Sequence, residues 1–245
     1  MKNYILIKWN IYKILNDRKK YRKCLAFYSQ FIHKDNLCFD VGAHEGNRTE
    51  IFLKLGAKVV AVEPQESCIN QLRQKFSKKA KFTLVNKGLS DREGELTLYI
   101  CRDATTISTF SNKWKTGRFS DYKWGENKLV PVTTLDNLIK KFGLPVFCKI
   151  DVEGFELKVL KGLSQPISYI SFEFTKEFFN DAKFCIDYLF SYLGYQEFNC
   201  SLGESMCMLF QNWVRPKELY QRLGSINDSL LWGDIYAKNK IDRLL

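Results

Sequence analysis

The segment FDVGAHEGNR, residues 39–48, combines an acid and two glycines in a spacing that could hold a small ligand. Asp40 stands two residues before Gly42, and Gly46 follows four residues later. Glycines at these positions would allow a tight turn and let the backbone approach a ligand closely. A helix beginning after Gly46 would turn its free N–H groups and the positive end of its dipole toward the same place. The alternative is that the two glycines serve the turn alone.

Glu63 ends a second apolar run, VVAVE, and lies 21 residues after Gly42. A carboxylate at the end of a neighbouring strand can accept hydrogen bonds from the hydroxyls of a ribose. Nicotinamide dinucleotides require G-x-G-x-x-G, whereas the spacing here is G-x-x-x-G, and Asp40 would repel a pyrophosphate. S-adenosylmethionine carries an amino group, a carboxylate and a ribose, so these residues favour S-adenosylmethionine as the cofactor.

A second group of acids, Asp151, Glu153 and Glu156, follows the apolar run VFCKI. A carboxylate at the end of this strand could take the proton from an alcohol as its oxygen attacks a methyl group. Asp151 and Glu153 are the candidates, and the sequence does not distinguish them; the alternative is that they cap the following helix. Glu173 interrupts the apolar run ISFEF, where an acid is costly unless paired, so we expect it to face the crevice or Lys149.

These residues need a scaffold, and the chain alternates apolar, strand-like runs with helical segments. This alternation predicts an α/β fold with a mostly parallel sheet that is covered by helices on both faces. Residues 195–202 and 206–211 are expected to form a terminal antiparallel pair. Residues 102–127 show no period and are expected to be a functional or mobile loop. The expected strands are 36–42, 58–64, 81–90, 94–100, 128–136, 146–151 and 167–174, and the expected helices are 47–56, 66–76, 136–143, 154–163 and 177–194.

The net charge of +11 lies mainly in the first 34 residues, which hold nine Lys and Arg and one acid. Apolar residues recur there at helical spacing, so residues 3–33 are expected to form one or two amphipathic helices. We therefore divide the chain into a basic helical segment, residues 1–35, and an α/β domain, residues 36–245. The apolar stripe is expected to pack on the core, and the basic face is either solvated or suits an anionic membrane, an anionic glycan or nucleic acid.

Composition excludes several classes of protein. Eight cysteines without a C-x-x-C pair, together with only two histidines, argue against a zinc site and indicate a reducing, cytoplasmic setting. No uncharged apolar run reaches the about 18 residues of a spanning helix, and the N-terminus lacks the pattern of a signal peptide. We expect no metal site, with a cation on Asp151, Glu153 and Glu173 as the alternative.

Six motifs resemble the FkbM family of S-adenosylmethionine-dependent methyltransferases over about residues 36–240. The most specific is KIDVEGFELKVLKGL (149–163), because the glycine loop alone marks only a broader superfamily. The resemblance implies a Rossmann-like class I methyltransferase fold and methylation of hydroxyls, notably of sugars and polyketide-type products. The other motifs are FDVGAHEGNRT (39–49), VVAVEP (59–64), VNKGLSD (85–91), VPVTTLDNLI (130–139) and ISFEF (170–174), and LLWGDIYAKN (230–239) is similar to the family's ending.

The resemblance also assigns site residues by position. It implies that the cofactor is held by Asp40, Gly42, Ala43, His44, Gly46, Glu63, Ser90 and Asp91. His44 departs from the family, which usually has Asn there, so its role is open between a hydrogen bond to the cofactor or substrate and a neutral replacement. Asp151 and Glu153 are expected to face the acceptor.

Together these observations predict an O-methyltransferase that acts on a hydroxyl, with a saccharide of a cell-surface glycan or its precursor as the acceptor. The basic segment, residues 1–34, could bring the enzyme to the inner face of a membrane. Nucleic acid is not the expected acceptor, because DVEG stands where an N-P-P-Y-like motif would follow the strand. The alternative is a non-catalytic module that binds membrane or RNA on a degenerate methyltransferase fold.

Overall fold

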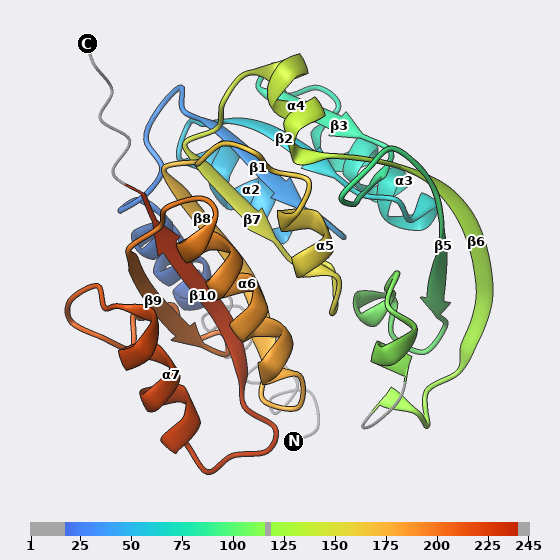
Figure 1. Cartoon of the computed structure of the whole chain (residues 1–245). Helices are drawn as coiled ribbons and strands as arrows, with labels where there is room; N and C mark the ends of the chain where they lie inside the picture. The colour runs from blue at the N-terminus through green and yellow to red at the C-terminus, as the bar shows by residue number, and fades with distance from the viewer. Residues whose placement is uncertain (1–17, 116–118, 240–245) are drawn as a thin grey trace, which may run out of the picture.

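The computed structural model describes residues 18–115 and 119–239, and its centre is a seven-stranded sheet with the order β3-β2-β1-β7-β8-β10-β9. The first five of these strands run parallel, and β10 is antiparallel to both of its neighbours. The α/β, Rossmann-like class predicted from the sequence is confirmed (Figure 1). The strands are β1 (Leu37–Val41), β2 (Lys58–Val62), β3 (Phe82–Val85), β7 (Phe147–Ile150), β8 (Tyr169–Thr175), β9 (Glu197–Leu202) and β10 (Trp232–Lys238).

A smaller sheet stands beside the main one, toward the right of Figure 1. It contains β4 (Gly88–Leu89), β5 (Gly94–Cys101) and β6 (Trp124–Thr133), in the order β4-β6-β5. The run expected as one strand over 81–90 is therefore divided, with β3 in the main sheet and β4 in the small one. Two short 3-10 helices, η1 (Thr105–Ile107) and η2 (Asn112–Lys115), lie in the connection between β5 and β6.

Helices cover both faces of the main sheet. One face packs against α4 (Leu135–Phe142), α5 (Glu156–Leu160), α6 (Phe179–Ser191) and α7 (Pro216–Ser225). The other face packs against α2 (Asn47–Lys54), α3 (Glu66–Phe76) and the helical residues 18–28. Phe27, Tyr28 and Phe31 are buried there among Phe52 and Phe147, so the apolar side of residues 18–32 belongs to the core. Residues 1–17, including the first part of the expected helices, lie outside the described residues.

The first strand of the terminal antiparallel pair pairs with a different segment from the one predicted. Residues 206–211 form no strand; β9 instead pairs with β10, from Gly233↔Leu202 to Lys238↔Glu197. Met206 has a left-handed backbone (φ 48°), which interrupts an extended run directly after the turn. β10 is buried along Gly233–Ala237 between β8 and β9, and such a central strand is difficult to distinguish from other short apolar runs by periodicity.

Candidate active site

The turn after β1 is built from two left-handed glycines, Gly42 (φ 76°) and Gly46 (φ 84°). A Cβ at Gly42 would collide with the backbone carbonyl oxygen of Asp151, and one at Gly46 with the side chains of Leu72 and Phe76. The close approach that excludes side chains here is therefore to protein atoms. This packing brings the end of β1 against the end of β7, where the two predicted groups of site residues meet.

Glu63, which directly follows β2, is almost completely buried at the wall of a cleft. Its Oε2 accepts a hydrogen bond from the backbone N–H of His44 at 2.8 Å, and its Oε1 accepts one from the N–H of Gln65 at 2.8 Å. Burial raises the pKa of Glu63 to about 7. The hydrogen bonds from these two N–H groups lower the pKa and offset part of this rise. Glu63 thus fastens the end of β2 to the glycine turn, and each oxygen keeps a further lone pair for a ligand.

Asp40 lies on the sheet face beneath the turn and is 1% exposed. Its Oδ2 accepts a hydrogen bond from the hydroxyl of Thr49 at 2.6 Å, and burial raises its pKa while the neighbouring Lys149 lowers it. Asp40 and Lys149 are register partners on β1 and β7. Asp40 is not among the described residues that line the cleft, and its hydrogen bond with Thr49 joins β1 to α2, the helix that follows the glycine turn.

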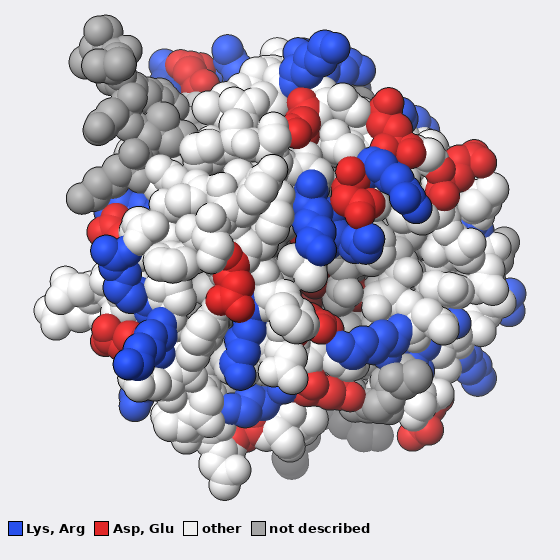
Figure 2. All heavy atoms as spheres, viewed as in Figure 1, with Lys and Arg blue, Asp and Glu red and all other residues white. Residues whose placement is uncertain are grey.

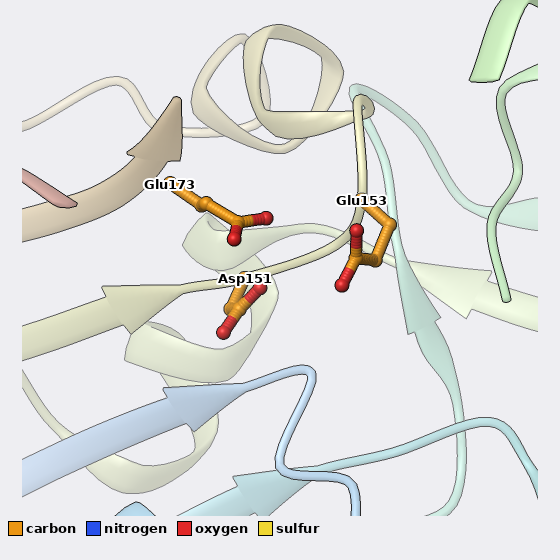
Figure 3. Close-up of side chains that lie close together, drawn as sticks. All are labelled: Asp151, Glu153 and Glu173. Carbon is orange, nitrogen blue, oxygen red and sulfur yellow. The ribbon is translucent and has the colours of Figure 1, made fainter. Parts of the chain in front are cut away.

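Three carboxylates converge at the ends of β7 and β8 (Figure 3). Asp151, Glu153 and Glu173 each offer an oxygen within 4.8 Å of the others, and this is the group of described residues that could hold a metal ion. Burial, followed by the charges of Glu153 and Asp151, raises the pKa of Glu173 well above its ordinary value. Asp151 and Glu153 line the cleft with Glu63, as predicted from the sequence, and Glu173 closes the group from the side of β8.

A buried ammonium balances part of this negative charge. Lys149 Nζ lies 2.5 Å from Asp151 Oδ2, and its side chain is 4% exposed. Burial alone would lower the pKa of Lys149, but the charges of Asp151 and Asp234 outweigh burial and raise it. The ion pair therefore holds one oxygen of Asp151 in place and leaves the other for the cleft.

The turn that carries Glu153 is held from two sides. Glu153 (φ 56°) and Gly154 (φ 85°) have left-handed backbones, and a non-glycine residue in this region is strained. Glu156 Oε1 accepts from the N–H groups of Val152 and Gly154 at 3.2 Å, and the Thr109 hydroxyl donates to the Glu153 carbonyl at 2.6 Å. Glu156 and Thr109 therefore preorganise the acidic turn.

Residues 105–110, which begin with η1, cover the cleft. His44 Nε2 and Thr105 Oγ1 lie 3.0 Å apart, and Gln65 Nε2 donates to the Thr105 carbonyl at 3.1 Å. The remaining free volume is about 40 Å³, compared with about 300–1,000 Å³ for small-molecule pockets. The cover must therefore move for a nucleoside-sized ligand to enter. Part of the predicted loop, residues 102–127, is thus a cover, and Trp114 in it is buried.

Other predicted residues lie at the margin of the cleft. Ala43 is buried and donates through its N–H to the Val62 carbonyl at 3.1 Å. Ser90 is buried behind β4, and Asp91 pairs with Lys158 at 2.8 Å. The described residues that line the cleft near them are instead Lys87, Gly88 and Leu89. Sequence reasoning missed Gln65, Thr105 and Thr109, since their roles depend on contacts across the fold.

Comparison with known proteins identifies the class. The family model described as "Methyltransferase FkbM domain" matches residues 40–197, and the chain belongs to this family. It is therefore an S-adenosylmethionine-dependent methyltransferase, which confirms the predicted family and cofactor and replaces the alternative of a non-catalytic module. Comparison with the curated proteins finds no match.

Comparison with solved structures finds methyltransferases at low sequence identity and with TM-scores below 0.5. Precorrin-6y C5,15-methyltransferase of Geobacter metallireducens has 11% identity and a TM-score of 0.46, with coverage of 89% of this chain and 86% of that chain. An rRNA methylase of Streptococcus thermophilus has 12% identity and a TM-score of 0.45, covering 87% and 93%. A TehB-like methyltransferase of Corynebacterium glutamicum has 10% identity and a TM-score of 0.46, covering 89% and 88%. At these values the acceptor has to be inferred from the site.

The residues around the cleft fit S-adenosylmethionine. Glu63 offers buried carboxylate oxygens for ribose hydroxyls, and Val62, Leu89 and Leu98 supply apolar walls suited to a purine ring. Burial lowers the pKa of His44, which keeps its ring neutral beside a cationic ligand. When bound, the cofactor supplies an electrophilic methyl group.

Proposed function

We propose that this methyltransferase transfers the methyl group to a hydroxyl of a saccharide, in a cell-surface glycan or its precursor. The observation that carries the proposal is the position of Asp151 and Glu153, which line the cofactor cleft and face Glu173. A hydroxyl is a weak nucleophile until its proton is removed, and a placed carboxylate can supply about 10²–10⁴ in rate. The resemblance to a family that methylates sugar hydroxyls supports the choice of acceptor.

In this proposal the chain's main contribution is positioning. Lys149 holds the Asp151 carboxylate, and Glu156 and Thr109 hold the backbone of the Glu153 turn, so this part of the site is ordered before the acceptor binds. Fixed geometry of this kind can contribute about 7–11 kcal/mol to a bimolecular reaction. The carboxylate closer to the hydroxyl takes its proton and becomes neutral, while the oxygen takes the methyl group and S-adenosylhomocysteine leaves. Lys149 holds Asp151 in position for this step.

An acceptor screen tests the proposal. Release of S-adenosylhomocysteine is measured with a panel of saccharides, with RNA oligonucleotides as the competing class. We expect turnover with saccharides, and we expect Asp151→Asn or Glu153→Gln to reduce kcat while cofactor affinity is kept. Asp187→Asn, on the exposed side of α6, is the matched control. Turnover with RNA alone would overturn the choice of acceptor.

Surface charge also supports a non-nucleic acceptor. Figure 2 shows Lys and Arg interspersed with Asp and Glu on the viewed face, with no continuous basic track. Nucleic-acid binding depends strongly on clustered Lys and Arg that neutralise phosphates. A neutral acceptor is more compatible with such a mixed face.

We further infer that the exposed basic residues at 18–23 contact an anionic membrane at the cytoplasmic face through charge. Arg18, Lys19, Arg22 and Lys23 are exposed, whereas the apolar side of this helix is buried in the core and cannot insert into lipid. No helix within residues 18–115 and 119–239 is long and apolar enough to span a bilayer. Each basic residue near an anionic surface adds about 1 kcal/mol. Sedimentation with phosphatidylserine vesicles should therefore be lost at high salt, and salt-independent binding would contradict the inference.

A further inference from the structure

A second cavity, of about 430 Å³, lies next to the cofactor cleft. It is enclosed by η2, the start of α5, the end of β8 and the start of α6, and Phe110 lines both spaces. The turn residue Glu153 faces the cleft, while the next residue, Gly154, faces the cavity. A ligand in this cavity would therefore lie beside the three carboxylates shown in Figure 3.

The cavity wall carries buried polar atoms without partners. Trp114 Nε1, Thr175 Oγ1 and Glu173 Oε2 are buried and have no hydrogen-bond partner among the described residues. Trp114 is 4% exposed and Thr175 is 5% exposed, and all three residues line this cavity. A buried polar group without a partner costs about 1–3 kcal/mol. Three such groups, from η2 and β8, around one cavity indicate a surface suited to a polar ligand.

The aromatic residues restrict the way in which a ligand can bind. The Trp114 ring packs against Phe119 and Phe178, each at 5.1 Å between ring centroids, so we assign recognition of a ligand to its N–H group. Phe110 and Phe155 form a further aromatic pair at 5.5 Å and offer an apolar wall. The buried polar atoms of the lining that have no partner among the described residues thus comprise one donor, one hydroxyl and one carboxylate oxygen beside apolar surface, and the lysines of the lining, Lys113 and Lys158, pair with Asp181 and Asp91.

Resting on the proposed function, we propose that this cavity is the acceptor site and that it binds a neutral, polyhydroxylated ring such as a pyranose. Trp114 Nε1 donates to a ring or hydroxyl oxygen, Thr175 Oγ1 exchanges a hydrogen bond with a second hydroxyl, and Glu173 Oε2 accepts from a third. The C–H face of the ring packs on Phe110 and Phe155. An anionic group is disfavoured beside the buried Glu173, because the two lysines of the lining, Lys113 and Lys158, already pair with the acids Asp181 and Asp91. The hydroxyl at Glu173 is the one placed near Asp151 for methylation.

Two conservative variants test the site without emptying the core. Trp114→Phe removes the N–H and keeps an aromatic ring in the stack, and Thr175→Val removes the hydroxyl and keeps the shape. Their matched controls are Trp213→Phe and Thr97→Val, which lie outside the cavity. Binding of a panel of methyl pyranosides is followed by saturation-transfer NMR in the presence of S-adenosylhomocysteine, with adenosine and uridine as competitors.

We expect at least one methyl pyranoside to bind, and each variant to weaken that binding about two- to tenfold, the effect of one hydrogen bond between neutral groups. The controls should bind as the wild type does. Equal binding by variants and controls, no pyranoside binding, or binding of a nucleoside in its place would overturn the proposal. S-adenosylhomocysteine affinity is measured in parallel by calorimetry. If the wild type does not bind S-adenosylhomocysteine, the assignment of the cofactor cleft is wrong. This result distinguishes a failure of the cofactor site from a failure of the proposed acceptor site.

Discussion

The protonation of Glu63 should control cofactor affinity near neutral pH. Burial raises the pKa of this carboxyl to about 7 from an ordinary value of 4.5. Both of its oxygens accept backbone N–H groups, so a proton on either one removes an acceptor and weakens the remaining lone pairs that a ribose would use. The ionised form is therefore the one expected to bind S-adenosylmethionine.

The magnitude follows from this pKa. About nine tenths of Glu63 is ionised at pH 8 and about one tenth at pH 6, so affinity should fall roughly tenfold between these values, or about 1.4 kcal/mol. Glu63→Gln should bind about 10- to 100-fold more weakly at pH 8, the effect of losing one charge-assisted hydrogen bond. The variant should also lose the component of the pH dependence that centres on about pH 7.

Isothermal calorimetry between pH 6 and pH 8 measures both effects. The ligand's own groups titrate equally with wild type and variant, so the difference between the two curves isolates Glu63. Glu66→Gln, an exposed acid one turn away on α3, is the control and should follow the wild-type curve. Parallel curves for wild type and Glu63→Gln would refute the assignment of Glu63 as the ionised ribose acceptor.

The same carboxyl predicts a stability profile. Because the folded pKa lies above the unfolded one, the folded state holds a proton that the unfolded chain releases between about pH 4.5 and pH 7. The free energy of unfolding should therefore decrease as pH rises through this window. The contribution of Glu63 to stability is largest below about pH 4.5. Glu156, whose pKa burial also raises to about 7, contributes in the same direction. Urea denaturation of Glu63→Gln should show a flatter profile than that of the wild type.

Three further substitutions test how the site is supported. Lys149→Met should destabilise the fold by about 3–5 kcal/mol in urea denaturation, because it leaves buried carboxylates without their cation; a loss below about 1 kcal/mol would contradict this. Gly42→Ala should cost about 1–3 kcal/mol or more through collision with a backbone carbonyl, whereas Gly224→Ala, in open space on α7, should stabilise by up to about 1 kcal/mol. Similar effects of the two alanines would refute the packing account. Thr109→Val should reduce kcat about two- to tenfold by releasing the acidic turn, and unchanged turnover would show that the turn holds its shape without this contact.

The parallel core could be predicted because its strands are short and mostly apolar, and because β1, β2 and β7 are each followed by a glycine or an acid. β1, β2, β7 and β8 lie where the sequence placed them, and parallel strands bring their carboxyl ends to one edge. This geometry alone brings Glu63 and Asp151 into one cleft. The glycine spacing together with Asp40 and Glu63 favoured S-adenosylmethionine, and the resemblance to a family implied the same cofactor.

The contacts that complete the site could not be predicted, because they join segments far apart in sequence. The hydrogen bond from Thr109 to the Glu153 carbonyl and the contact of Thr105 with His44 depend on the small sheet folding back over the cleft. A glycine is needed at position 42 because the backbone carbonyl of Asp151, directly after β7, lies against it. The local sequence does not show this contact. The strand pairing of β9 with β10 across more than twenty residues depends in the same way on tertiary packing.

The chemical nature of the methylated atom is the most direct test of the account. The purified enzyme is incubated with S-adenosylmethionine carrying a ¹³C-labelled methyl group and with the saccharide panel, and the product is observed by carbon NMR. A methyl resonance in the methoxy region, lost in Asp151→Asn or Glu153→Gln, is the result that the account predicts. A methyl group found on nitrogen or carbon would contradict the proposed function, because the carboxylates would then not be acting on a hydroxyl.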